Sequence, residues 1–280
     1  MSAQLLVFSD LDGSLLDHFS YGWAAAADAL QRLQSAGIPL ILASSKTRAE
    51  MAPLQQALGV AHYPMIVENG AAVVVPAGTF SAPLENAVPC SAGQEVRFAP
   101  PRSRWLATLA ALKMDFPGEF AGFDDLGVDG IQAATGLDAA GAALAACREF
   151  SEPVQWLGAR ARRDAFVAAL QAAGARVQQG GRFLTVAGQC DKGLALRYLR
   201  AAYQREAPGQ TVHDLAIGDS GNDVPMLEVA ESALLVRSPT HDFPSLARRS
   251  GLRRSAALGP AGWSEGVLAW LRDYQITEGD

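Results

Sequence analysis

The 280-residue chain has few of the residues that build disulfide frameworks and zinc sites. It holds three cysteines, Cys90, Cys147 and Cys190, at wide spacing, and four histidines without the mutual spacing of a metal site. This pattern predicts free thiols in a reducing compartment and argues against a disulfide-stapled or zinc-stabilised domain.

The chain also lacks a long basic run and an apolar segment of membrane-spanning length. Its net charge of -6 gives no electrostatic basis for binding nucleic acid or a membrane surface. The first apolar run has no basic residues before it and is interrupted by Asp10, so neither a signal peptide nor a membrane span is predicted. We expect a cytoplasmic protein with a small-molecule partner. The hydrophobic share of 49% is enough for two domains with substantial cores.

The most informative segment is residues 5–14, LLVFSDLDGS, an apolar run that ends in two carboxylates, Asp10 and Asp12. Such a run is typical of a strand buried on both faces of a parallel sheet, and open α/β sheets bind ligands beyond the carboxyl ends of their strands. Two carboxylates this close repel each other unless they share a cation or a proton, and Mg²⁺ suits oxygen ligands beside a phosphate. On these residues alone, an ordinary Asp-x-Asp-Gly turn is an equally good interpretation.

Three further segments place polar side chains where other elements begin or end. Residues 215–223, LAIGDSGND, again open from an apolar run into acidic sequence, Ser44 follows the apolar residues 40–43, and Lys192 enters a helical pattern. Together with residues 5–14, these segments resemble the four motifs of the haloacid dehalogenase-type phosphatases, in that family's order. The one departure is Ser44, where the family often has threonine, and serine keeps the hydroxyl.

The resemblance implies a chemical role for each motif. Asp10 is the expected nucleophile and forms an aspartyl phosphate, while Asp12 protonates the leaving alcohol and later activates water. Ser44 and Lys192 are expected to stabilise negative charge on the phosphoryl oxygens. Asp12 is also expected to offer its backbone carbonyl to the metal. The expected Mg²⁺ site is formed by Asp10, Asp12, Asp219 and Asp223.

The order of predicted elements indicates an α/β protein with a Rossmann-like, three-layer core, a mostly parallel sheet and an inserted α+β cap domain. The core is assigned to residues 1–83 and 189–280, and the cap to residues 84–188, where proline and glycine punctuate short stretches. The predicted core helices are 23–36, 47–58, those that follow Asp191 and Asn222, and 263–271, with strands at 38–43, 65–67, 213–217 and 233–236. The predicted cap helices are 104–113, 139–149 and 161–173, with strands near 154–157 and 183–186.

An inserted domain beside a phosphoryl-transfer core is expected to exclude water and to supply specificity contacts. Four segments resemble motifs of one branch of the superfamily, the mannosyl-3-phosphoglycerate phosphatases: residues 148–153 and 180–183 in the cap, and 45–48 and 68–70 in the core. This resemblance implies that Arg148 or Arg182 holds a glycerate carboxylate. The other interpretation of residues 148–152 is a charged helix end before Pro153. The expected substrate-binding residues are Ser45, Lys46, Asn69, Arg148, Glu149, Ser151, Arg182 and Asn222.

The sequence therefore predicts a Mg²⁺-dependent phosphatase that converts mannosyl-3-phosphoglycerate into mannosylglycerate and phosphate through an aspartyl phosphate. Glucosyl-3-phosphoglycerate or another sugar phosphate is the alternative substrate, because the orientation of one hydroxyl separates mannose from glucose. Two other activities stay open: a phosphomutase, which passes the phosphoryl group to a sugar hydroxyl, and a phosphosugar-binding protein that keeps the fold without catalysis. The sequence predicts no oligomeric state.

Overall fold

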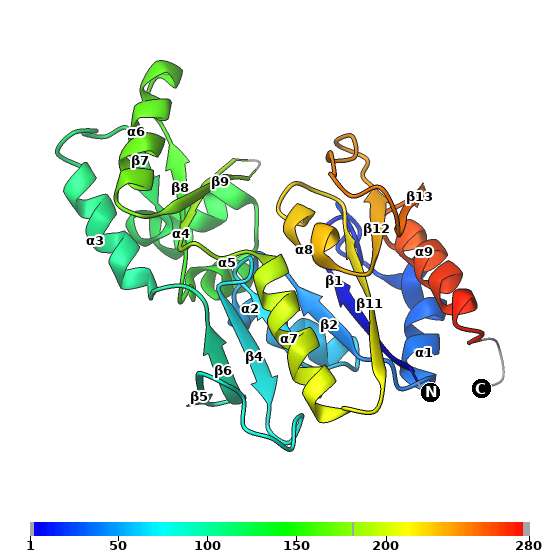
Figure 1. Ribbon diagram of the computed structural model, residues 1–280. Helices are drawn as coiled ribbons and strands as arrows, with labels where there is room; N and C mark the ends of the chain where they lie inside the picture. The colour runs from blue at the N-terminus through cyan, green and yellow to red at the C-terminus, as the bar shows by residue number, and fades with distance from the viewer. Residues whose placement is uncertain (1–2, 181, 277–280) are drawn as a thin grey trace.

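A computed structural model describes residues 3–180 and 182–276 of the chain. The molecule has two parts that lie side by side, a core built on a nine-stranded sheet and a cap built on a four-stranded sheet (Figure 1). The cap is inserted between the two halves of the core, and the predicted α/β class is confirmed. No helix in the described ranges combines the length and the apolar character needed to cross a membrane.

The core sheet is mostly parallel, as predicted. Its strands are β1 (Ala3–Ser9), β2 (Leu40–Ala43), β3 (Met65–Val67), β4 (Ala72–Pro76), β5 (Ala87–Cys90), β6 (Gly93–Arg97), β11 (Thr211–Gly218), β12 (Ser232–Arg237) and β13 (Leu252–Leu258). They lie in the order β13-β12-β11-β1-β2-β3-β4-β6-β5. Strands β13 to β3 of this order are parallel to one another, whereas β4, β6 and β5 extend the sheet with antiparallel pairing.

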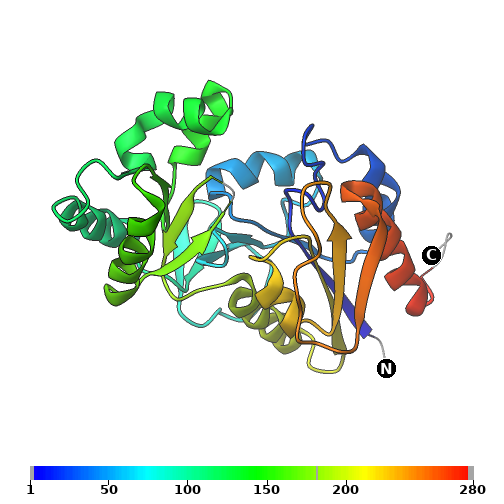
Figure 2. The same ribbon diagram turned by 90° about the horizontal axis from the view of Figure 1, so that it is seen from above.

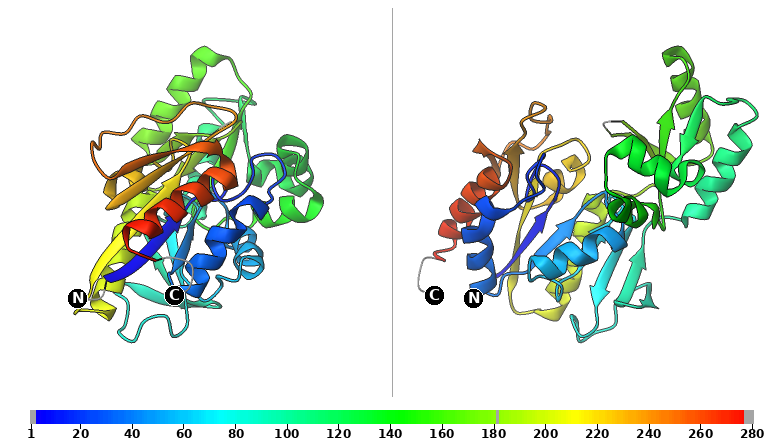
Figure 3. Two further views of the ribbon diagram at one scale, coloured as in Figure 1. Left: turned by 90° about the vertical axis from the view of Figure 1, so that its right-hand side faces the viewer. Right: turned by 180° about the vertical axis from the view of Figure 1, so that it is seen from behind.

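Helices cover both faces of this sheet, which explains the uninterrupted apolar run in β1. The core helices are α1 (Ala27–Ser35), preceded by a 3-10 turn (Ala24–Ala26), α2 (Arg48–Ala57), α7 (Lys192–Glu206), α8 (Val224–Val229) and α9 (Gly259–Asp273). Leu5 and Val7 pack in one cluster with α1, α2 and α9, while Leu6 and Phe8 pack with α7 and α8 on the opposite face. Figure 2 shows the two helical layers, and Figure 3 shows α1 and α9 side by side in one of them.

Local sequence signals set the start of α2, which follows one of the predicted site loops. Thr47 precedes the helix and its hydroxyl accepts a hydrogen bond from the Glu50 backbone N–H at 3.1 Å. The Glu50 carboxylate accepts in return from the Thr47 N–H at 2.8 Å. This reciprocal capping box satisfies two backbone donors at the helix start, so the loop between β2 and α2 has a defined end.

The cap is a four-stranded antiparallel sheet with two of its helices on one face. Its strands are β7 (Phe120–Gly122), β8 (Glu152–Trp156), β9 (Arg176–Gln179) and β10 (Leu184–Ala187), in the order β7-β8-β10-β9. Its helices are α3 (Arg102–Leu112), α4 (Phe123–Thr135), α5 (Ala139–Ala146) and α6 (Arg160–Ala172). Trp105 of α3 and Phe166 of α6 pack against Val154 and Val186, which covers one face of the cap sheet. The other face is left for contact with the core.

The structure moves the start of the insertion from the predicted residue 84. Strands β5 and β6 form a hairpin that pairs with β4, so residues 87–97 belong to the core sheet. The first cap element is α3. The last cap strand, β10, ends at Ala187, and the next core helix, α7, begins at Lys192.

Candidate active site

The loops that carry the four motifs meet at one edge of the core sheet. Asp10 follows β1, Ser44 follows β2 and Asp219 follows β11, while Lys192 begins α7. The Asp10 backbone N–H donates to the Ile217 carbonyl at 2.9 Å, so the ends of β1 and β11 are held in register. Because the carboxyl ends of parallel strands lie at the same edge, side chains far apart in sequence converge there.

Lys192 is fully buried between two carboxylates. Its Nζ lies 2.5 Å from Oδ1 of Asp10 and 2.6 Å from Oδ1 of Asp223. Burial by itself would lower the pKa of Lys192, but the charges of Asp10 and Asp223 raise it above its ordinary value. Asp223 Oδ2 in turn accepts from the backbone N–H groups of Asp219 and Ser220 at 3.1 and 3.0 Å. Asp223 therefore connects the 219–223 loop to the buried ammonium.

Three buried carboxylates at this point fit a divalent cation. Asp10, Asp219 and Asp223 each bring an oxygen within 4.8 Å of the other two. Burial and then the charge of Asp223 raise the pKa of Asp10 well above its ordinary value, against the opposing effect of Lys192. Burial and Asp223 also raise the pKa of Asp219 to about 6. After burial, repulsion between the carboxylates is the main cause of both shifts, and a divalent cation at this point would offset both effects.

Two details of Asp219 support a ligand role. Its Oδ1 is buried and accepts no hydrogen bond from a described residue. A Cβ on Gly13 would lie 2.6 Å from its Oδ2, and Gly13 has a φ of +84° that other residues rarely adopt. Glycine at position 13 therefore leaves the space that the Asp219 carboxylate occupies.

Asp12 stands apart from the three clustered carboxylates. Its Oδ1 lies 3.0 Å from Nζ of Lys46, and the Lys46 ammonium lies 5.4 Å from the centre of the Tyr21 ring. Burial would lower the pKa of Lys46, but the charge of Asp12 and the hydrogen bond to it raise the pKa above its ordinary value. The structure thus separates the carboxylate of Asp12 from the metal cluster, and its predicted metal contact depends on its backbone carbonyl.

Hydrogen bonds join the other predicted core residues around the same loops. Ser44 is buried, and its hydroxyl accepts from the Lys46 N–H at 3.2 Å. The Asn69 N–H donates to the Ser44 carbonyl at 2.9 Å, and the side chain of Asn222 donates to Oδ1 of Asn69 at 3.0 Å. The structure therefore brings Ser44, Lys46, Asn69 and Asn222 together.

A pocket of about 720 Å³ lies between this edge of the core and the cap. The core side includes Asp10, Asp12, His18, Ser45, Asn69, Ser220, Gly221, Asn222, Thr240 and His241, and the cap side includes Arg176, Val177, Gln178, Gln179, Gly180 and Thr185. A volume of this size suits a small-molecule ligand built from two or three covalently linked chemical groups. His241, one of the four histidines without the spacing of a metal site, lies in this lining with its Nε2 3.3 Å from Oδ2 of Asp219.

Strand alternation places three of the cap residues that line the pocket on one face of the cap sheet. Arg176 and Gln178 are two residues apart on β9, and Gln178 lies directly opposite Thr185 on β10, so all three side chains share a face of the cap sheet. Nη1 of Arg176 donates to the Cys190 carbonyl at 2.9 Å and to Oδ2 of Asp191 at 3.0 Å. Sequence reasoning missed these residues, because a four-residue strand carries too little alternation to identify its pocket face.

The cap residues predicted to bind substrate lie elsewhere. The guanidinium of Arg182 donates to the carbonyls of Ala134 and Thr135 at the end of α4, at 2.7 and 3.2 Å. Arg148 donates to the Ser45 carbonyl at 3.2 Å and to the Ser151 hydroxyl at 3.0 Å. Neither arginine lines the described pocket.

Glu149 and Ser151 also contact protein rather than the pocket. The Glu149 carboxylate accepts from Nη2 of Arg48 at 2.9 Å, and the backbone N–H groups of Glu149 and Ser151 donate to Glu68. The helix predicted over residues 139–149 ends at Ala146. The N–H groups of Cys147 and Arg148 donate to the Leu144 and Ala146 carbonyls in a tight turn, and that of Glu149 donates to Glu68.

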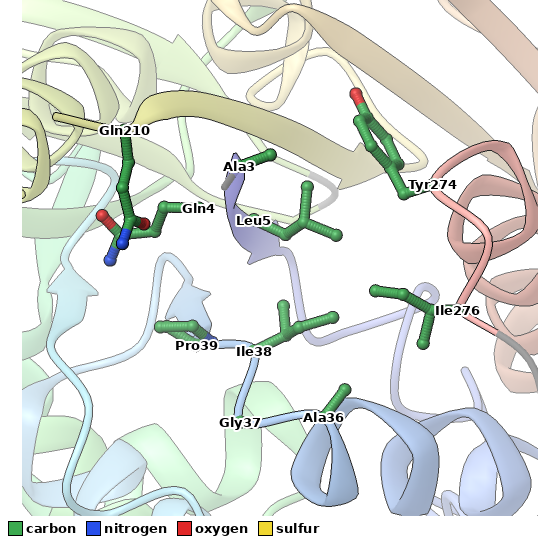
Figure 4. Close-up of a pocket in the computed structure, with 10 residues that line it drawn as sticks. All are labelled: Ala3, Gln4, Leu5, Ala36, Gly37, Ile38, Pro39, Gln210, Tyr274 and Ile276. Atoms are coloured by element: carbon green, nitrogen blue, oxygen red, sulfur yellow. The ribbon is translucent and has the colours of Figure 1, made fainter. Parts of the chain in front are cut away.

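A second pocket lies at the opposite end of β1, where it is lined by residues of β1, the α1–β2 turn and the segment after α9 (Figure 4). It has a volume of about 380 Å³. Its described lining contains no acidic or basic side chain, so it offers no group for phosphoryl chemistry.

Comparisons with known proteins place the chain in a family. Residues 7–82 match the haloacid dehalogenase-like hydrolase family. The glucosyl-3-phosphoglycerate/mannosyl-3-phosphoglycerate phosphatase of Methanococcoides burtonii is 32% identical over 263 residues, which cover 94% of this chain and 96% of that protein. Such identity over nearly the whole of both chains is evidence of a shared family and not of a shared fold alone.

Solved structures show the same fold. The sucrose-phosphatase of Synechocystis has a TM-score of 0.61 and 15% identity, and the match covers 98% of this chain and 99% of that one. The sugar phosphatase BT4131, of subclass IIB of the haloacid dehalogenase superfamily, has a TM-score of 0.63 and 14% identity, and the match covers 98% of this chain and 100% of that one. The converging motif loops and the full-length relative lead to one conclusion: the chain belongs to the haloacid dehalogenase-like hydrolases and is a phosphatase of that family.

Proposed function

We propose that the protein is a Mg²⁺-dependent sugar phosphatase that hydrolyses a glycosyl-3-phosphoglycerate, with mannose or glucose as the glycosyl group. The observation that carries the proposal is the placement of Asp10, held by Lys192, on the core side of a pocket whose cap side presents Arg176. The relative that is 32% identical is named for both glycosyl groups. A phosphate and a carboxylate in one substrate match an anion site on each side of the pocket.

Asp10, Asp219 and Asp223 are the residues that would hold Mg²⁺. Their oxygen donors, their burial and the unpartnered Oδ1 of Asp219 suit a hard divalent cation. When bound, Mg²⁺ supplies positive charge that stabilises the phosphoryl oxygens as negative charge develops on them. The neighbouring Lys192 supplies a fixed positive charge from the protein itself.

In the first half of the reaction, Asp10 is the proposed nucleophile. Lys192 contacts Oδ1 of Asp10, and no described residue donates a hydrogen bond to Oδ2. A carboxylate oxygen of Asp10 bonds to phosphorus while the bond from phosphorus to the glycerate oxygen breaks. Asp12, two residues away and also in the pocket lining, donates a proton to that leaving oxygen.

In the second half, Asp12 takes a proton from a water molecule. The water oxygen bonds to phosphorus while the bond from phosphorus to Asp10 breaks, which releases inorganic phosphate and restores the Asp10 carboxylate. Lys46 lies 3.0 Å from Oδ1 of Asp12 and holds that carboxylate in place through both steps. The Asp12 carboxyl group thus acts first as the acid and then as the base.

Arg176 is the proposed ligand of the glycerate carboxylate. Its Nη1 is anchored by Asp191 and the Cys190 carbonyl, while Nε and Nη2 have no hydrogen-bond partner among the described residues. Guanidinium nitrogens with this freedom suit a carboxylate, and the neighbouring amide and hydroxyl of Gln178 and Thr185 suit sugar hydroxyls. The assignment replaces Arg148 and Arg182, whose donors are directed to protein carbonyls.

The test is phosphate release in the presence of Mg²⁺ from five substrates: mannosyl-3-phosphoglycerate, glucosyl-3-phosphoglycerate, 3-phosphoglycerate, mannose 6-phosphate and glucose 6-phosphate. We expect kcat/KM for the two glycosyl-3-phosphoglycerates to exceed that for the hexose phosphates by about 100-fold or more, since a satisfied arginine–carboxylate pair provides discrimination of this order. Equal activity on all sugar phosphates would contradict the substrate assignment and leave the mechanism standing. Transfer of phosphate between sugar hydroxyls without release would indicate a mutase instead.

A further inference from the structure

The turn after β3 holds a buried carboxylate that the proposed mechanism does not use. Glu68 is 1% exposed, and its φ of 47° lies in the left-handed region. Four donors converge on its oxygens: the N–H of Glu149 on Oε1 at 2.8 Å, and the N–H of Phe150, the N–H of Ser151 and the hydroxyl of Ser151 on Oε2 at 3.2, 2.8 and 2.5 Å. An ionised carboxylate only accepts hydrogen bonds, so this arrangement of donors matches its chemistry.

All four donors belong to one cap segment, residues 147–151, which joins α5 to β8 and which we call the anchor loop. Although it lies inside the insertion, this loop is packed on the core. The Phe150 side chain is 3% exposed and lies in the core hydrophobic cluster that contains Leu5 and Val7. The Phe150 carbonyl also accepts a hydrogen bond from the indole N–H of Trp105, a buried side chain of α3, at 3.0 Å. The anchor loop therefore ties the cap to the core at a point other than the two chain connections.

Those two connections run close together. A Cβ on Gly188, in the return connection, would lie 3.0 Å from Cβ of Ala99 and 2.7 Å from Pro100 in the outgoing one. Two connecting segments that lie side by side form a narrow hinge, and such a hinge by itself restrains the orientation of a domain only weakly. A further point of attachment is needed to fix the cap sheet over the catalytic aspartates.

The backbone of the same turn is bonded to the catalytic loop. The Glu68 N–H donates to the Lys46 carbonyl at 3.0 Å, and the Asn69 N–H donates to the Ser44 carbonyl at 2.9 Å. Asn69 also has a left-handed φ, of 60°, and two consecutive non-glycine residues in this region persist only where their surroundings hold them. The side chain of Glu68 thus holds the cap while its backbone holds the loop that contains Ser44 and Lys46.

We propose that Glu68 is a positioning residue that sets the orientation of the cap over the active site through the anchor loop. Its side chain is absent from the pocket lining and bonds only to the anchor loop, so the effect of that carboxylate on the reaction passes through the cap, whose face carries Arg176. Arg148 supports the contact, with Nη1 3.9 Å from Oε2 of Glu68 and donating to the Ser45 carbonyl. The residues that resemble a substrate motif in sequence, 148–151, form the attachment of the cap.

The variant Glu68→Gln tests this role with little change in shape. The glutamine amide presents donors in place of one carboxylate oxygen, so at least one N–H of the anchor loop loses its acceptor. Glu149→Gln is the matched control, since it makes the same change in the same loop at a side chain that is 43% exposed and paired with Arg48. An exposed ion pair of this kind contributes little.

The readout compares two substrates: the sugar phosphate that the wild-type protein hydrolyses fastest, and p-nitrophenyl phosphate, which has no hydroxyl or carboxylate for the cap to bind. For Glu68→Gln we expect kcat/KM for the sugar phosphate to fall about tenfold, mainly through KM, and that for p-nitrophenyl phosphate to change less than about twofold. Glu149→Gln should behave as wild type with both. Because the sugar phosphate is chosen by activity, the result does not depend on the glycerate substrate proposed above.

Equal losses with both substrates would overturn the proposal, because they would place the defect in the catalytic loop or in the fold. Unchanged kinetics with both would overturn it as well. Ser151→Ala, which removes one donor and keeps the carboxylate, decides the question if Glu68→Gln does not fold. It should give the same selective loss at about threefold.

Discussion

The core and the cap use similar side chains for different purposes. In the core, the polar residues that follow parallel strands converge, so that Lys192 lies 2.5 Å from Asp10 and 2.6 Å from Asp223. In the cap, the arginines that stand out in sequence, Arg148 and Arg182, donate to protein carbonyls and do not line the described pocket. The end of a parallel strand is a position shared with its neighbours, whereas the pocket face of a short antiparallel strand depends on register.

The largest expected effect comes from the core nucleophile. We expect Asp10→Asn to lower kcat by about 10⁴-fold or more with every phosphate ester, because the amide cannot form the acyl phosphate. The measurement is phosphate release at saturating Mg²⁺. Full turnover in this variant would contradict the covalent mechanism. A loss confined to sugar phosphates would contradict the assignment of catalysis to the core and of substrate specificity to the cap.

The next effect concerns the buried lysine. Lys192→Met leaves Asp10 and Asp223 buried without their cation, so we expect kcat to fall by about 10²- to 10³-fold and unfolding free energy to fall by about 3 kcal/mol. Chemical denaturation measures the second quantity, with phosphate release measured on the same sample. Wild-type stability in this variant would show that the lysine is not needed to balance the two carboxylates.

The cap is tested by a pair of arginine variants. Arg176→Met should lower kcat/KM by about 10- to 100-fold for substrates with a carboxylate and by less than about threefold for hexose phosphates, because it removes donors for that one group. Arg182→Met is the control and should leave both values near wild type. The reverse result would return the carboxylate contact to Arg182 and make the sequence-based assignment correct.

A smaller effect is the dependence of Mg²⁺ binding on pH. The pKa of Asp219 is raised from 3.8 to about 6 in the folded protein, so without metal this group makes folding less favourable as pH rises through that range. Mg²⁺ competes with the bound protons, and we expect it to raise Tm by about 5 °C near pH 7.5 and by much less near pH 5. Thermal unfolding with EDTA or Mg²⁺ at the two pH values measures this. Asp219→Asn should remove most of the difference.

Much of the core could be predicted because several independent signals agree there. The run in β1 is apolar because both faces are covered, the capping box at Thr47 and Glu50 marks the start of α2, and the acidic loops follow strands that neighbour one another. Segments that depend on tertiary contacts were harder to predict. The sequence predicts the β5–β6 hairpin as part of the cap, because proline and glycine interrupt this stretch as they do at a domain boundary. Only its pairing with β4 shows that the hairpin belongs to the core sheet.

The cap illustrates why residue type alone is not enough. The predicted helix 139–149 is too long because the chain turns away after Ala146, and the N–H groups of residues 149–151 donate to Glu68, about eighty residues earlier in the chain. Helix α4 was not predicted, since it contains two glycines, of which Gly127 has a φ of 61°. Arg176 was overlooked because nothing in the sequence of β9 indicates which of its faces meets the core.

The central claim is that Asp10 carries the phosphoryl group while Asp12 moves the protons. The most direct test is Asp12→Asn with p-nitrophenyl phosphate and Mg²⁺, because this leaving group needs no proton but hydrolysis of the intermediate still needs a base. After acid quenching and proteolysis, mass spectrometry should find one phosphoryl group on the peptide that contains Asp10. A phosphoryl group on another residue, or p-nitrophenol release at the wild-type steady rate with no labelled peptide, would contradict the account.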